Sequence, residues 1–135
     1  MSQEKFELVR RLVDAFNARD GEAACAVLSN DAEWRPAYTG GGELEGAVYR
    51  GHEGFRRYLD DLAETWREME GYIDELREVG EHVLLLARIR FVARASGLKM
   101  TQPITGVFTF RDDKIATAHY YVERSEALEA VGLSE

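Results

Sequence analysis

The segment "HYYVE" at residues 119–123 places an imidazole, two phenols and a carboxylate next to one another in the sequence. Imidazole titrates near neutral pH and a partly buried carboxylate can be tuned toward it, so His119 and Glu123 are candidates for acid–base chemistry. In a strand, however, successive side chains point to opposite faces of the sheet. If this segment is a strand, His119 and Tyr120 lie on different faces, and the strand pairing decides which of them faces a pocket.

Two other motifs lack the residues that their chemistry needs. The segment "TGGGELEG" at residues 39–46 is rich in glycine, but no Lys-Ser/Thr pair follows and its glutamates repel phosphate, which favours a loop. The segment "HEGFR" begins like a zinc-protease helix, but Arg56 stands where the second histidine must be. His52, His82 and His119 are scattered along the chain. We therefore expect no metal site and no cofactor.

The composition restricts the class of protein. The chain has 135 residues, of which 45% are hydrophobic, which is enough for one core and a single domain over residues 1–135. There are 17 Lys and Arg residues against 25 Asp and Glu residues, and the net charge of −8 repels nucleic acid and anionic membranes. Cys25 is the only cysteine, and no apolar run approaches membrane-spanning length. We expect a cytoplasmic protein with neither nucleic acid nor membrane as a partner.

Apolar residues at steps of three and four predict three helices in the first half of the chain. On the first helix these residues are Phe6, Val9, Val13 and Phe16. The segment "NARDG" ends this helix and lets Asp20 cap a short second helix over residues 22–28. Residues 32–38 read as a strand that Pro36 interrupts. The third helix, within residues 49–66, carries the stripe Phe55, Tyr58, Leu59, Leu62, Ala63 and Trp66.

The second half of the chain reads as four strands, at residues 71–79, 81–95, 98–111 and 114–123. A two-residue turn at Ser96-Gly97 pairs Phe91 with Gln102 and makes one face of the sheet apolar. The residues of that face are Ala87, Ile89, Phe91, Met100, Ile104, Phe108 and Phe110. Gln102 is a polar group on this otherwise apolar face, and such a residue often marks a pocket.

The last strand allows two pairings. Alternation favours Ala116, Ala118, Tyr120 and Val122 on the inner face. A tight turn at Asp112-Asp113 instead pairs Phe110 with Ile115 and turns His119 inward, unless a bulge restores the first arrangement. We favour the bulge. After the strand, Ser125 is the expected cap of a short helix that packs through Ala127, Leu128 and Val131.

Four segments together resemble the SnoaL-like branch of the nuclear transport factor 2-like superfamily: "VDAFNARDGEAACAVLSNDAEWRP", "YRGHEGFRRYL", "ARASG" and "RDDKIATAHYYVERSEALEAVGL". The resemblance covers nearly the whole chain. It implies an α+β fold, a cone-shaped cystatin-like roll in which a curved antiparallel sheet wraps three helices of the N-terminal half, with a short C-terminal helix. It also implies a hydrophobic ligand in the mouth of the cone and a homodimer that packs the outer sheet faces together.

The residues that act in enzymes of this superfamily are not found at the matching positions. Ketosteroid isomerases carry a tyrosine and two aspartates where the resemblance places Leu12, Pro36 and Gly106. SnoaL-type cyclases carry an aspartate base near the position of Tyr120, and an unperturbed tyrosine is a poor base at neutral pH. Scytalone-type dehydratases use histidines, which only an inward His119 would match. These departures favour binding over catalysis.

We therefore expect a protein that binds a small hydrophobic molecule, or alternatively a cofactor-free cyclase, isomerase or dehydratase with Tyr120 or His119 as the catalytic residue. The expected ligand-binding residues are Trp34, Tyr38, Tyr58, Trp66, Phe91, Gln102, Phe108 and Tyr120. The expected homodimer buries the opposite face of the sheet, with Arg88, Arg90, Arg94, Thr101, Thr105, Thr109, His119 and Tyr121.

Overall fold

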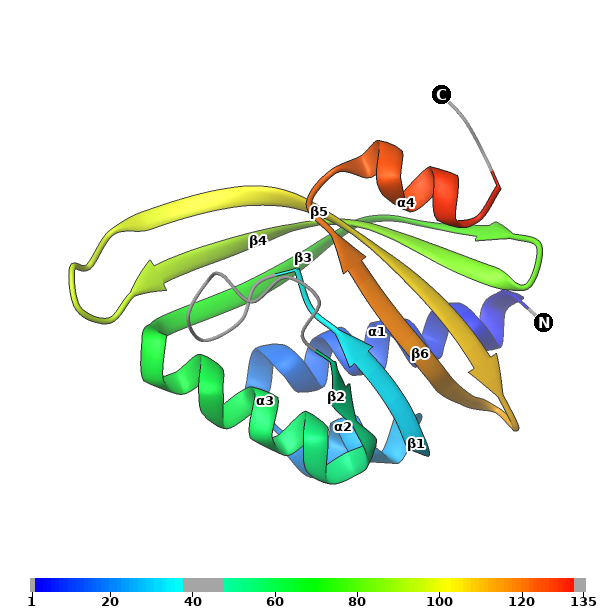
Figure 1. Cartoon of the computed structure of the whole chain (residues 1–135), viewed down its shortest axis with the longest axis horizontal. Coiled ribbons are helices and arrows are strands. Elements are labelled where there is room, and N and C mark those ends of the chain that lie inside the picture. The colour runs from blue at the N-terminus through cyan, green and yellow to red at the C-terminus, as the bar shows by residue number, and fades with distance from the viewer. Residues whose placement is uncertain (1, 38–47, 133–135) are drawn as a thin grey trace.

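The computed structural model describes residues 2–37 and 48–132 as an α+β fold in which one curved sheet wraps around helices (Figure 1). The helices are α1 (Ser2–Ala18), α2 (Gly21–Val27), α3 (Gly51–Thr65) and α4 (Arg124–Ala130). The strands are β1 (Leu28–Arg35), β2 (Tyr49–Arg50), β3 (Trp66–Val79), β4 (His82–Ala93), β5 (Lys99–Arg111) and β6 (Lys114–Tyr121). The expected fold class is confirmed.

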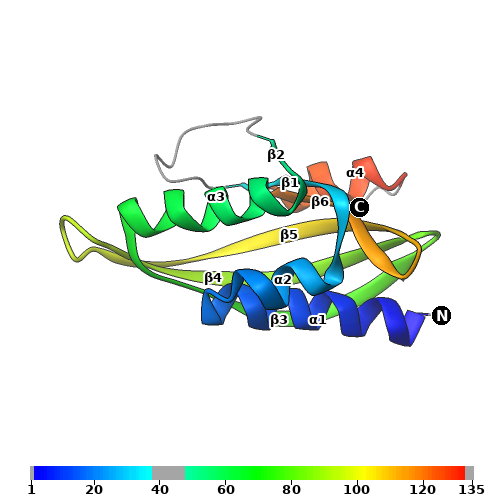
Figure 2. The same ribbon diagram turned by 90° about the horizontal axis from the view of Figure 1, so that it is seen from below.

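The six strands form one sheet in the order β2-β1-β6-β5-β4-β3. All neighbouring pairs are antiparallel except β1 and β6, which are parallel, so the sheet is mixed rather than purely antiparallel. Figure 2 shows α1 running along β3 on one side of the cone and α3 lying near β1 and β2 on the other. The concave face of the sheet and these helices enclose the core.

The N-terminal helices form as the apolar periodicity predicts. Val9 and Phe16 of the predicted stripe are buried together with Leu12, whereas Phe6 and Val13 are half-buried. The Asp20 side chain caps α2 by accepting a hydrogen bond from the Ala23 N–H at 3.1 Å. Asn17 then ties α1 to the edge of the sheet. Its amide donates to the Gly71 carbonyl at 3.0 Å and accepts from the Gly71 N–H at 2.8 Å. The edge strand β3 is therefore held at a fixed place beside α1.

Helix α3 buries most of the predicted stripe. Phe55, Tyr58, Leu59 and Leu62 are buried, whereas Ala63 is exposed and Trp66 already belongs to β3. The stripe ends one turn earlier than expected because the chain leaves the helix at Thr65 to enter the sheet. Tyr58 lies on the buried side of α3, in the same core cluster as Leu85 and Ile89 of the concave face.

The predicted register between β4 and β5 is wrong by two residues. Phe91 pairs with Met100 and Ile89 with Gln102, so the loop covers residues 94–98 instead of Ser96-Gly97 alone. Arg94 leaves the ladder because its backbone N–H donates to the Thr65 carbonyl at 3.0 Å and its Nε donates to the Ala63 carbonyl at 3.0 Å. A shift of two keeps every side chain on its face, so the predicted apolar face is still the concave one.

The β5–β6 connection contains both features that the sequence analysis considered, the tight turn and the bulge. Asp112 and Asp113 have positive φ angles of 51° and 62°, and this tight turn pairs Phe110 with Ile115. A bulge follows, because the next pair joins Thr109 to Thr117. Ile115 and Ala118 are buried, at 0% and 1% exposure. The even-numbered face therefore turns inward from Ala118 onward.

Two details at the end of β6 differ from expectation. Val122 lies beyond the strand and is exposed, so it does not continue the inner face. Helix α4 begins at Arg124 after Glu123, and no side chain caps it, so Ser125 is not its cap. Ala127, Leu128 and Val131 do form the packing face, and they cover Leu84 and Val107 on the outer side of the sheet.

No helix among residues 2–37 and 48–132 is long and apolar enough to cross a membrane. In the same part of the chain, no group of three or more His, Cys, Asp or Glu residues is placed to hold a metal ion.

Candidate functional site

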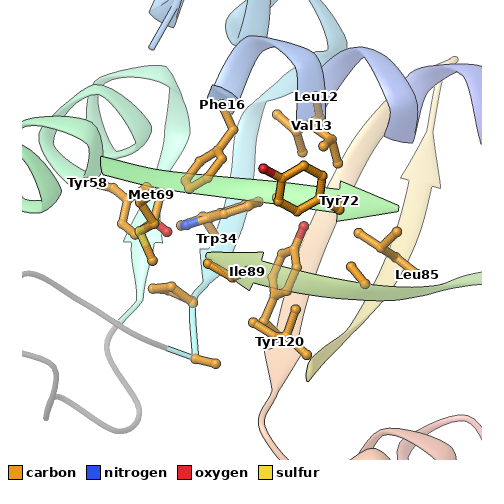
Figure 3. Close-up of a pocket in the computed structure, with 15 residues that line it drawn as sticks. Leu12, Val13, Phe16, Trp34, Tyr58, Met69, Tyr72, Leu85, Ile89 and Tyr120 are labelled. Carbon is orange, nitrogen blue, oxygen red and sulfur yellow. The ribbon is translucent and has the colours of Figure 1, made fainter. Parts of the chain in front are cut away.

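A cavity lies between the concave face of the sheet and the helices α1 and α3 (Figure 3). The space inside it that is wide enough for a water molecule has a volume of about 40 Å³. Together with the narrow gaps between the lining side chains and the part open to solvent, the empty space amounts to about 530 Å³. Ligand pockets typically measure about 300–1,000 Å³, so a ligand fits only by using the open part and displacing lining side chains.

The cavity lining is almost entirely apolar. The lining residues are Leu12, Val13, Phe16, Trp34, Pro36, Ala37, Tyr58, Met69, Gly71, Tyr72, Leu85, Ala87, Ile89, Ile104 and Tyr120. Among these described residues there is no Asp, Glu, His, Lys, Arg or Cys. The polar side-chain atoms are the indole nitrogen of Trp34 and the hydroxyls of Tyr58, Tyr72 and Tyr120, so this lining offers hydrogen bonds but no charge at neutral pH.

Trp34 is held rigidly at the wall of the cavity by other rings. Strand β1 directs it inward, where its ring centroid lies 5.1 Å from Phe55, 5.3 Å from Tyr58 and 5.1 Å from Tyr120. The side chain is 5% exposed, and its Nε1 is a buried donor without a hydrogen-bond partner among the described residues. A buried unpaired donor costs about 1–3 kcal/mol, so this atom calls for an explanation.

Tyr58 and Tyr120 bring two hydroxyl groups to the same cavity. Burial raises the pKa of Tyr58, and the neighbouring Trp34 N–H offsets only part of this increase. Burial, and then the nearby Tyr58, raises the pKa of Tyr120 as well. In Figure 3 the hydroxyl end of Tyr120 points into the cavity, and the Trp34 nitrogen is turned toward Tyr58. Both phenols are therefore protonated at neutral pH, where they can donate hydrogen bonds but cannot act as bases.

Tyr72 is the fourth polar residue of the lining, and its hydroxyl already has a partner. It donates to Glu70 Oε1 at 2.7 Å, and this bond is the first cause of the raised pKa of Tyr72. The side chain is 39% exposed. Tyr72 therefore stands at the solvent side of the cavity, and its hydroxyl is less available to a ligand than those of Tyr58 and Tyr120.

Gly106 determines where the Tyr120 ring can lie. The two residues face each other across β5 and β6. A Cβ atom at position 106 would lie 3.0 Å from Phe108 Cε1 and 3.1 Å from Tyr120 Cε2, closer than ordinary carbon contacts. Phe108 is fully buried and packs edge-on against Tyr120 at 5.7 Å. The tyrosine ring thus occupies the space that any side chain at position 106 would need.

The cavity brings together three of the predicted ligand-binding residues, Trp34, Tyr58 and Tyr120. Four others do not line it. Trp66 and Phe91 pack on each other at 5.0 Å, Phe108 lies behind Tyr120, and Gln102 is half-buried beside Ile89. Tyr38 and the glycine-rich segment 39–46 lie outside the described residues. Whether any of these residues contacts a ligand stays a prediction.

Several lining residues were missed by the sequence analysis, among them Leu12, Met69, Gly71 and Leu85. On β3 the alternation of Met69, Gly71 and Ile73 was an available signal. It was overlooked because the strand was expected to begin at Gly71, whereas it begins at Trp66. Leu12 and Leu85 are apolar side chains of a helix and a strand, and residue type alone does not separate core from cavity wall.

His119 lies on the outer face of the sheet, away from the cavity. Its ring stacks on Tyr121 with centroids 4.1 Å apart, and the Tyr121 hydroxyl lies 3.0 Å from His119 Nδ1. Burial and then Arg35 lower the pKa of His119, so the imidazole is neutral at pH 7. Of the two alternative catalytic candidates, Tyr120 therefore lines the cavity and His119 does not.

This chain matches a known protein family. The sequence profile of the SnoaL-like domain matches residues 9–118. A search of curated proteins finds no match. The fold is similar to that of an NTF2-like protein of unknown function from Burkholderia pseudomallei, with 24% identity, 96% of this chain and 98% of that one covered, and a TM-score of 0.78.

Two further solved structures share the fold. TerC, crystallised with polyporic acid, is 22% identical over 95% of this chain and 98% of its own, with a TM-score of 0.78. A candidate polyketide cyclase from Xanthomonas campestris is 20% identical over 96% of this chain and 98% of its own, with a TM-score of 0.71. At these identities the similarity shows the fold alone.

Proposed function

This chain belongs to the SnoaL-like domain family, and from that premise and the cavity we propose that it binds a small, largely apolar molecule between its helices and its sheet. The observation that carries the proposal is an apolar cavity whose described lining holds only four polar side chains, none of them charged at neutral pH. Apolar pockets with a few polar groups that orient the ligand are typical of small-molecule sites. TerC, a neighbour with the same fold, was crystallised with a small organic molecule, which supports this reading.

A second candidate function is cofactor-free catalysis of the cyclase, isomerase or dehydratase kind. The observation in its favour is the Tyr120 hydroxyl, which points into the cavity and can polarise a substrate carbonyl by hydrogen bonding. Acid–base catalysis also needs a base within reach of the substrate, and the described lining offers none with a suitable pKa. Binding without turnover is therefore the better-supported proposal.

Replacing Tyr120 with phenylalanine is expected to weaken ligand binding about two- to tenfold, because it deletes one hydroxyl from the cavity. The ring and its contacts with Trp34 and Phe108 remain, so the fold should be unchanged. Calorimetric titration with a panel of aromatic polyketides and steroids identifies a binder and then measures its affinity for each variant. Turnover of any panel compound, followed in parallel, distinguishes the enzyme from the binding protein.

The matched control is Tyr121→Phe, which removes the same hydroxyl from the next residue but on the outer face. It should leave ligand affinity unchanged. The reverse result, with Tyr121→Phe or His119→Ala weakening binding and Tyr120→Phe silent, would contradict the assignment of the inner face.

We also propose that the protein is a homodimer that buries the outer face of the sheet. One part of this face, at Leu84 and Val107, is covered by α4. Another part displays ion pairs, in which Arg88 lies 2.9 Å from Asp74 and Arg90 lies 2.9 Å from Glu68. Mixed charged, hydroxyl and aromatic groups suit a moderately polar two-fold interface.

Sedimentation at micromolar concentration is expected to give about twice the chain mass of 15.3 kDa, and His119→Ala should shift the equilibrium toward the monomer. Tyr120→Phe, on the inner face, is the variant expected to sediment like the original protein. A lone species of 15.3 kDa would rule the homodimer out.

A further inference from the structure

We propose that the cavity selects an uncharged ligand with a hydrogen-bond acceptor, such as a ketone oxygen, and that Trp34 and Tyr58 together supply the hydrogen bond. This inference rests on the proposed function, since it names the chemical class of the molecule bound. The starting observation is the Trp34 Nε1 atom, which is buried, belongs to a lining residue and has no hydrogen-bond partner among the described residues. An indole nitrogen is a donor only, so its missing partner must be an acceptor.

The Tyr58 hydroxyl is the natural link between this donor and the ligand. The Trp34 N–H lies close enough to lower the pKa of Tyr58 in part, although the two groups do not meet in hydrogen-bond geometry. A phenol accepts through its oxygen while it donates its own proton. When a ligand oxygen accepts a hydrogen bond from the Tyr58 hydroxyl, the lone pair of the phenol oxygen can turn toward the Trp34 N–H. Each bond in such a chain polarises and strengthens the next.

The aromatic cluster around the pair keeps its geometry fixed. Tyr58 is 3% exposed and packs against Trp34 at 5.3 Å, Phe55 at 5.7 Å and Tyr49 at 5.3 Å. The Tyr49 ring is itself anchored, because its hydroxyl donates to Asp61 Oδ2 at 2.8 Å. The rings of the donor pair are therefore packed in place before a ligand arrives, which lowers the entropy cost of ordering these two side chains.

The charge of the ligand follows from the rest of the lining. No Lys, Arg or His is among the described residues that line the cavity, and burial keeps both phenols protonated. An ionised carboxylate entering this space would lose its water without gaining a counter-charge, which is far more costly than burying a ketone. The same groups that attract a neutral acceptor therefore do not compensate an anion.

Three small aromatic probes of similar size separate these effects: acetophenone carries a neutral acceptor, ethylbenzene carries none, and benzoate carries an anion. Their affinities for the full chain are measured by NMR titration. Because ethylbenzene is the more hydrophobic probe, the informative quantity is the ratio of acetophenone affinity to ethylbenzene affinity. That ratio is expected to fall about two- to tenfold in Tyr58→Phe, which removes the linking hydroxyl and keeps the ring.

Tyr121→Phe is the matched control, since it removes a tyrosine hydroxyl that lies beside His119 on the outer face of the sheet and does not line the cavity. It should leave the ratio unchanged. Benzoate should show no binding at neutral pH and should begin to bind as the pH falls through its own pKa.

A direct spectroscopic readout does not depend on any variant of the donor pair. The indole N–H resonance of Trp34, distinguished from that of Trp66 by the Trp66→Phe variant, should move downfield with acetophenone and not with ethylbenzene. An unchanged affinity ratio in Tyr58→Phe, or benzoate binding as well as acetophenone at neutral pH, would overturn the inference while the proposed function stands. Failure of all three probes to bind would contradict the proposed function as well.

Discussion

Replacing Gly106 with alanine is expected to destabilise the fold by about 1–3 kcal/mol, because the new methyl group overpacks a filled region. The added Cβ would lie 3.0 Å from Phe108 Cε1 and 3.1 Å from Tyr120 Cε2. Phe108 is completely buried, whereas Tyr120 is only half-buried, so we expect the tyrosine ring to shift and its hydroxyl to leave its place in the cavity. Ligand affinity should fall at least as far as in Tyr120→Phe, by about two- to tenfold or more.

The matched control is Gly71→Ala, which makes the same change elsewhere in the same sheet. A Cβ at position 71 would lie 3.8 Å from Asn17 Oδ1 and 3.8 Å from Val13 Cγ1, which are ordinary contacts. This variant should be unchanged or more stable by about 0.4–1 kcal/mol, since alanine restricts the unfolded chain more than glycine does. Urea denaturation measures both variants. Equal stability changes at the two positions would show that Gly106 and Tyr120 are not sterically coupled.

The protein is expected to show no isomerisation of a Δ5-3-ketosteroid. The sequence resemblance aligns Leu12 and Pro36 with a tyrosine and an aspartate of the ketosteroid isomerases, and both residues line the cavity. The same resemblance aligns Gly106 with the second aspartate, and the Tyr120 ring takes up the space that a side chain at this position would need. The described lining of the cavity holds no carboxylate that could act as the base, so the step that removes a proton next to the carbonyl has no catalyst there.

The measurement is the growth of conjugated-enone absorbance in the presence of the protein, compared with buffer and with the Tyr120→Phe variant. Turnover above the buffer rate that Tyr120→Phe abolishes would show that a phenol at the cavity is sufficient for this chemistry. In that case the alignment of the isomerase residues with Leu12, Pro36 and Gly106 would be wrong.

The helices and the faces of the strands follow from the sequence by itself. Val9, Leu12 and Phe16 recur with the helical period, and Asp20 caps α2 as its residue type predicts. These features depend on contacts between residues near one another in the chain. The face of each strand is equally robust, because the two-residue error in the β4–β5 register leaves Ile89 and Phe91 on the inner side.

Strand register and the final turn depended on tertiary contacts. The β4–β5 loop is longer than the turn residues suggest because Arg94 binds the end of α3, a segment about thirty residues earlier in the chain. The last hairpin combines the tight Asp112-Asp113 turn with a bulge before Thr117. The alternation of apolar and polar residues in the last strand predicted that Tyr120 faces inward and His119 outward. The residues of the turn alone predicted the opposite orientation.

The cavity itself was decided only by the tertiary structure. Trp34, Tyr58 and Tyr120 come from β1, α3 and β6, and their meeting depends on the parallel pairing of β1 with β6 and on the position of α3. The sequence pattern also predicts that the aromatic side chains of Trp66 and Phe91 point inward, yet these two side chains pack against each other instead of lining the cavity. Apolar periodicity identifies a side chain that is withdrawn from water. Whether that side chain meets another or borders an empty volume depends on how closely distant elements approach, and no local pattern encodes that distance.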